Sequence, residues 1–99
     1  MTDLPSAVQH RPERQRFELA CPGGPAVLTY LLTDRGATMT HTLVPTRAEG
    51  TGVGSTLTRA ALDWARDEGL EVDPQCWFVA GWLDRHPEHP VRRAGRPRR

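Results

Sequence analysis

EGTGVGSTLTRAALDWARDEG, residues 49–69, is the stretch that decides the fold. Glycines alternate at positions 50, 52 and 54, and a helical pattern follows them directly. Apolar side chains recur there at helical spacing and form one stripe, at Val53, Leu57, Ala61, Trp64 and Ala65. Gly69 is a natural residue for the end of such a helix. The stretch therefore predicts a glycine loop followed by a helix over residues 55–68.

Three strands are predicted before the loop, because residues 14–20, 26–33 and 37–44 alternate in polarity or are rich in β-forming residues. CPGGP (21–25) and DRG (34–36) are turns by composition. In the third strand we expect Met39, His41 and Leu43 on one face. The other face is expected to carry Thr38, Thr40, Thr42 and Val44.

After the helix, residues 70–76 are predicted to form a further short strand, and WFVAGWLDRHPE a second helix that ends at the His86-Pro87 step. The order strand, strand, strand, glycine loop, helix, strand, helix predicts one α+β domain over residues 14–90. Residues 1–13 are predicted to be a flexible lead-in, and residues 91–99 a disordered basic tail.

Length and composition fit a single domain, since domains run from about 50 to 250 residues and the chain has 99. Cys21 and Cys76 have no metal-ligand spacing, so no metal is expected. The start of the chain lacks the apolar run of a secretory signal. The longest apolar stretch, 78–83, is far shorter than the ~20 residues of a membrane span. We therefore expect a cytoplasmic protein with reduced thiols and no membrane contact.

The basic residues are unevenly distributed. VRRAGRPRR, residues 91–99, holds five of the thirteen arginines and no acid, and the rest of the chain is acidic. Arginines can neutralise the phosphates of a nucleic acid. However, no aromatic residue is interleaved with them, so we expect a solvated tail and not a nucleic-acid interface. The sequence gives no indication of oligomeric state.

The glycine loop is a candidate phosphate site, because the first turn of a helix presents unpaired N–H groups and a partial positive charge. A Walker A loop needs lysine, and the chain has none. The dinucleotide pattern G-x-G-x-x-G needs glycine at position 55 or 57, where Ser55 and Leu57 stand. Both of these phosphate loops are therefore excluded.

EGTGVG resembles instead the Q/R-x-x-G-x-G/A signature with which acyltransferases of the GNAT superfamily bind the pyrophosphate of acetyl-CoA. The resemblance extends over about residues 15–89, which look like the small, single-domain YjdJ-type N-acetyltransferases. Besides the glycines, it is carried by His41-Thr42, Pro45, Gly69, Pro74, Cys76 and His86-Pro87-Glu88. It implies a GNAT-like, mixed and mostly antiparallel sheet, with the main helix after the central strand and a short C-terminal helix.

The resemblance also implies a function: transfer of an acetyl group from acetyl-CoA to a primary amine of a small molecule or protein. It implies a cofactor site in which backbone amides face the pyrophosphate, at Gly50, Thr51, Gly52, Val53, Gly54 and Ser55. Leu43 and Val44 would pair with the pantetheine arm as an added strand does. Glu49 stands where the signature has Gln or Arg, and Arg47 is the candidate for the missing positive charge.

Many GNAT enzymes are similar in using a tyrosine on the last helix as the acid, but here Trp82 occupies that position and the only tyrosine is Tyr30. Cys76 is the candidate replacement, as an acid or as a nucleophile. His41 is the candidate base for the amine. A buried structural role remains open for both. Trp64, Trp77 and Trp82 are expected in the core or a pocket wall. A second functional reading is a module that binds CoA or acetyl-CoA with little or no transfer.

Overall fold

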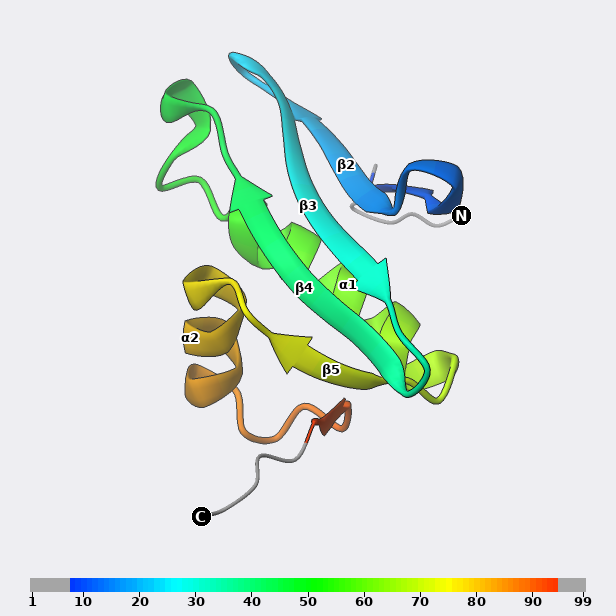
Figure 1. Cartoon of the computed structure of the whole chain (residues 1–99). Coiled ribbons are helices and arrows are strands. Elements are labelled where there is room, and N and C mark those ends of the chain that lie inside the picture. The colour runs from blue at the N-terminus through cyan, green and yellow to red at the C-terminus, as the bar shows by residue number, and fades with distance from the viewer. Residues whose placement is uncertain (1–7, 95–99) are drawn as a thin grey trace, which may run out of the picture.

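A six-stranded sheet and two α-helices make up the part of the chain that the computed structural model describes, residues 8–94 (Figure 1). The elements are β1 Gln9–Arg11, β2 Arg16–Cys21, β3 Gly24–Leu32, β4 Gly36–Leu43, α1 Val53–Asp67, β5 Glu71–Pro74, α2 Trp77–Arg85 and β6 Arg92–Arg93. Short 3-10 turns cover Pro12–Arg14 and Thr46–Ala48. The predicted α+β class, and the predicted order from β2 to α2, are confirmed.

The strands lie in the sheet in chain order, from β1 to β6. The first four are antiparallel neighbours, whereas β5 runs parallel to β4 and β6 parallel to β5. The parallel pair arises because α1 crosses between β4 and β5, as a parallel connection requires. The mixed, mostly antiparallel sheet with the main helix after β4 matches the prediction.

Helix α1 covers one face of the sheet and packs against β2, β3, β4 and β5. Its inner side chains Leu57, Ala61 and Leu62 have no exposed surface. They meet the fully buried Leu28 and Met39 from the sheet in one core. Burying each large apolar side chain stabilises the fold by roughly 1.5–3 kcal/mol. The opposite face, toward the viewer in Figure 1, carries no helix within residues 8–94. We call it the helix-free face.

Two short strands lie in segments that we expected to be irregular. β1 belongs to the predicted lead-in, and the ring of His10 stacks on Phe17 at 4.1 Å and bonds the hydroxyl of Tyr30 at 2.6 Å. β6 belongs to the predicted tail, and Arg93 bonds Asp84 at 3.0 Å. A strand of two or three residues is too short to show alternation of apolar and polar residues. Its pairing can therefore be recognised only in the structure. Residues 1–7 and 95–99 lie outside the described part.

Candidate functional site

The three glycines of the loop have different physical roles. Gly50 and Gly52 have φ of 81° and 88°, in the left-handed region that side chains disfavour, and no atom would contact a Cβ at either position. Gly54 is helical, and its missing Cβ makes room for a ring: a Cβ there would lie 2.7 Å from Cζ of Phe78. The first two glycines therefore shape the turn, and the third allows α1 to approach α2.

The start of α1 presents unpaired amide groups. Gly52 is the residue before the helix, and no side chain caps the turn. The Thr51 amide donates to the Ala48 carbonyl at 3.2 Å, so the expectation that it faces a ligand is wrong. Within residues 8–94 no backbone acceptor pairs with the amides of Gly50, Gly52, Val53, Gly54 and Ser55. These donors are in the position where a helix terminus binds anions.

The hydroxyl of Ser55 fastens α2 to this end of α1. Its Oγ accepts a hydrogen bond of 2.8 Å from the indole Nε1 of Trp82, a side chain with no exposed surface. The guanidinium carbon of Arg59 lies 5.1 Å from the centre of the same ring. Trp82 is therefore a core residue, as predicted, whose N–H bond orients the second helix.

Strand β4 contains a β-bulge, which corrects the predicted faces. Tyr30 pairs with Met39, but the preceding residue Thr29 pairs with His41, so Thr40 is an extra residue. The hydroxyls of Thr29 and Thr40 bond each other at 2.6 Å, which puts Thr40 and His41 together on the helix-free face.

Beyond the bulge, Thr42 and Val44 join Met39 on the helix side, and Leu43 faces the helix-free side. The expected alternation with Met39, His41 and Leu43 on one face was wrong, because a bulge adds one residue to a strand of period two.

β4 and β5 separate at the bulge. Their pairing ends at Met39 and Pro74, and the Cys76 amide makes the next bond, 3.0 Å to the Met39 carbonyl. β5 then turns into α2, whereas β4 continues to Leu43 (Figure 1). Within the described chain, no strand pairs with this last part of β4 on the β5 side. It has a free backbone edge close to the start of α2.

Cys76 lies where this edge, α1 and α2 meet. It is the residue before α2, with 8% of its surface exposed, and its Sγ is 3.5 Å from Oγ1 of Thr42. Burial raises the pKa of the thiol, but hydrogen bonds between the sulfur and Thr42, and with the backbone of Val79 and Phe78, outweigh it. The pKa of Cys76 therefore lies below its usual value, in the direction that favours acid or nucleophilic chemistry.

Residues 16–91 match the protein family described as GCN5-related N-acetyl-transferase. The chain belongs to this family. Among its relatives is Protein NATD1 of Mus musculus, 31% identical over 86 residues, which are 84% of this chain and 78% of the relative. Protein NATD1 of Gallus gallus is similar to the same extent, 31% over 86 residues with the same coverage. Protein NATD1 of Danio rerio is 29% identical over 86 residues, 84% of this chain and 77% of the relative.

The other predicted site residues of this member of the family are divided between the two faces. His41 is exposed on the helix-free face, and Leu43, with 69% of its surface exposed, lies there too. Val44 packs against the core. The stem of Arg47 lies near Gly23 in the turn between β2 and β3, since a Cβ on that glycine would be 3.3 Å from Cβ of Arg47.

The acid that many GNAT enzymes use has no counterpart at this site. Trp82 donates its only polar hydrogen to Ser55. Tyr30 is 2% exposed, bonds His10, and packs 4.8 Å from the ring of Trp64. Burial also raises the pKa of Tyr30. Neither aromatic residue is available as the proton donor, so Cys76 stays the candidate acid.

Two residues at the site were not found from the sequence in their present roles. Thr42 contacts the thiol of Cys76 because the bulge turns it to the helix side. The threonine-rich sequence of this strand gives no sign of the bulge. Trp77 was expected in the core or a pocket wall, and 82% of its surface is exposed. Its position directly after Cys76 was the available signal, since the first residue of a helix whose buried stripe begins at Val79 faces outward.

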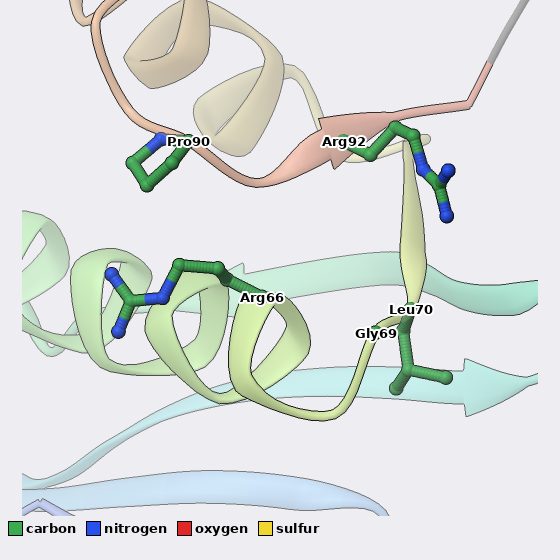
Figure 2. Close-up of a pocket in the computed structure, with 5 residues that line it drawn as sticks. All are labelled: Arg66, Gly69, Leu70, Pro90 and Arg92. Atoms are coloured by element: carbon green, nitrogen blue, oxygen red, sulfur yellow. The ribbon is translucent and has the colours of Figure 1, made fainter.

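A hollow of about 250 Å³ lies elsewhere, at the other end of α1 (Figure 2). It is lined by Arg66, Gly69, Leu70, Pro90 and Arg92. The guanidinium of Arg66 pairs with Asp67 at 2.8 Å, and Arg92 lies 3.8 Å from Glu71. In Figure 2 the two arginine side chains extend in opposite directions. The free donors of the candidate site lie at the opposite end of the helix, at the start of α1.

Within residues 8–94, no three His, Cys, Asp or Glu side chains gather as ligands of a metal ion would. Neither helix in this part of the chain has the length and apolar character needed to cross a membrane.

Proposed function

We propose that this GCN5-related N-acetyltransferase transfers the acetyl group of acetyl-CoA to a primary amine. One observation carries the proposal: the unpaired amides at the start of α1 lie beside a free strand edge and a thiol of lowered pKa. Three contacts tie these features together. Phe78 covers Gly54, Trp82 bonds Ser55, and Cys76 bonds Thr42.

The residues present fit acetyl-CoA. The amides from Gly52 to Ser55 suit a diphosphate, because bare N–H groups and the helix dipole act together. The free backbone edge of β4 suits the amide groups of pantetheine, as a sheet edge suits an added strand. Glu49 is exposed, so its carboxylate is able to turn toward solvent.

Residues on both faces of β4 have roles in the proposed reaction. The amine nitrogen attacks the thioester carbon, so a C–N bond forms and the C–S bond breaks. His41, on the helix-free face, accepts the proton that leaves the amine. Cys76, on the helix side, gives its thiol proton to the departing sulfur. In the two-step alternative the Cys76 thiolate takes the acetyl group first and releases CoA as its thiolate. The acetyl group then passes to the amine, the Cys76 thiolate is restored, and His41 accepts the proton of the amine.

The cofactor site is tested by Gly52→Asp, with Gly69→Asp as the matched control. Both glycines have positive φ with open space around them, 88° and 73°, so the backbone cost is similar. Only position 52 puts a carboxylate at the amides of α1. Acetyl-CoA at a hundred times its Kd should stabilise the wild type by about 2.7 kcal/mol. Gly69→Asp should keep this stabilisation, and Gly52→Asp should raise Kd at least tenfold, about 1.4 kcal/mol.

The chemistry is tested by release of the CoA thiol with an amine, using Cys76→Ser and His41→Gln. Both variants should lose turnover while they keep the thermal shift with acetyl-CoA. An acetylated Cys76 seen by mass spectrometry before the amine is added would select the two-step route. If acetyl-CoA stabilises the protein but no amine is acetylated, the chain is a binding module. If millimolar acetyl-CoA gives no stabilisation, both readings fail.

A further inference from the structure

Trp77 is the most exposed large apolar side chain in the described part of the chain, with 82% of its surface exposed. It follows Cys76 directly, and its ring lies 6.0 Å from that of Phe78, which covers the start of α1 at Gly54. The side chain of Trp77 is not buried in the core, so core packing does not explain why a tryptophan stands at this position. Among aromatic side chains, the indole of tryptophan binds a cation over its face most strongly.

Asp73 adds a negative charge to the same segment. It pairs with Thr38, whose other neighbour is the exposed Leu31, so it faces the helix-free side. Gln75 holds the carboxylate by a bond of 3.0 Å to Oδ2. The previous acid on this face, Glu71, has Arg92 3.8 Å away. Asp73 has no arginine or histidine partner within residues 8–94.

In this segment Gln75 and Trp77 are exposed and Asp73 is half-buried, whereas Cys76 and the preceding Val72 are buried. His41 lies on the same helix-free face as Asp73, so an amine that meets His41 approaches from that side. Asp73 precedes Cys76 by three residues, which is at most about 10 Å of extended chain.

We propose that the segment Asp73–Trp77 recognises a second positive charge on the acceptor, which makes the acceptor a short diamine or polyamine. The proposal rests on the proposed acetyl transfer and names its substrate class. The reacting nitrogen loses its proton to His41. The far nitrogen stays protonated, and the groups of this segment that recognise its charge are the Asp73 carboxylate and the indole of Trp77.

The experiment compares 1,4-diaminobutane with butylamine, which has the same carbon chain without the second charge. With the full chain and saturating acetyl-CoA, kcat/KM should be at least tenfold higher for the diamine. Trp77→Ala and Asp73→Asn should bring the ratio toward one, mainly through a higher KM for the diamine. Leu31→Ala, an exposed apolar change, and Glu88→Gln, an exposed acid, serve as controls and should keep the ratio.

A ratio near one in the wild type would overturn the proposal and leave the acetyl transfer intact. So would a preference for phenethylamine that Asp73→Asn does not change, because Trp77 would then hold an apolar group. A second measurement does not depend on acetyl-CoA. The diamine, and not butylamine, should change the tryptophan fluorescence of the free protein, and Trp77→Phe should abolish that change. An absent response to both amines would count against recognition by this segment even if transfer occurs.

Discussion

Removing the hydroxyl of Ser55 should destabilise the fold without touching the backbone donors of the cofactor site. In Ser55→Ala the indole N–H of Trp82, which has no exposed surface, loses its acceptor at 2.8 Å. A buried donor without a partner costs about 1–3 kcal/mol. Alanine gains up to about 0.7 kcal/mol of helix propensity. The net loss is about 1.5 kcal/mol, which lowers Tm by about 6–12 °C in a domain of this size.

Urea unfolding of Ser55→Ala and Thr56→Ala makes the comparison. Thr56 also carries a hydroxyl in the first turn, but the residue is only half-buried and its bond of 3.0 Å to the Gly52 carbonyl is open to solvent, so its loss should stay within about 0.5 kcal/mol. In a Trp82→Phe background the cost of Ser55→Ala should vanish. The reasoning is refuted if the two alanine variants are equally stable, or if the double-mutant cycle shows no coupling. Acetyl-CoA should still bind Ser55→Ala, since the amide remains.

Two further predictions concern titratable groups. Thr42→Val should raise the pKa of the Cys76 thiol, because a hydrogen bond to the thiolate is lost; thiolate absorbance against pH in a Cys21→Ser background measures it, and an unchanged midpoint would contradict the assignment. Burial lowers the pKa of His10 against the opposing effect of Glu13 and Glu68. The unfolded chain therefore binds the proton more tightly, and the free energy of unfolding should fall as the pH drops below about 6.5. His10→Phe should flatten this part of the profile.

The elements that the sequence predicts well are those whose signal is local. The apolar stripe of α1, the alternation in β2 and the His86-Pro87 stop of α2 are each readable within one segment. β1 and β6 were missed because their signal is distant. His10 is placed by rings on β2, β3 and α1, and β6 by its pairing with β5.

The candidate site could be predicted as a loop and a thiol, but not as a geometry. The glycines and Cys76 can be recognised in the sequence by their residue type and spacing. The face on which His41 lies depends on one extra residue in β4. The neighbouring residues are threonines, so the pattern of apolar and polar residues does not reveal that extra residue. The free amides also depend on pairing that no sequence pattern reports: Thr51 is bonded to Ala48 and Gly52 is not.

The bulge itself is open to a direct test, deletion of Thr40. The deletion restores a regular ladder, so His41 would still face the helix-free side, and Thr42 and Val44 the helix side. The core contacts should survive, and the loss is one threonine–threonine bond of 2.6 Å, about 0.5–1.5 kcal/mol. What changes is the bend that a bulge gives a strand. A straight β4 would remain next to the segment after Pro74 and close its free edge. We therefore expect a folded protein, by circular dichroism and urea unfolding, that no longer gains stability from acetyl-CoA. If the deletion variant folds and binds acetyl-CoA as the wild type does, the bulge does not open this edge, and the separation of β4 from β5 has another cause.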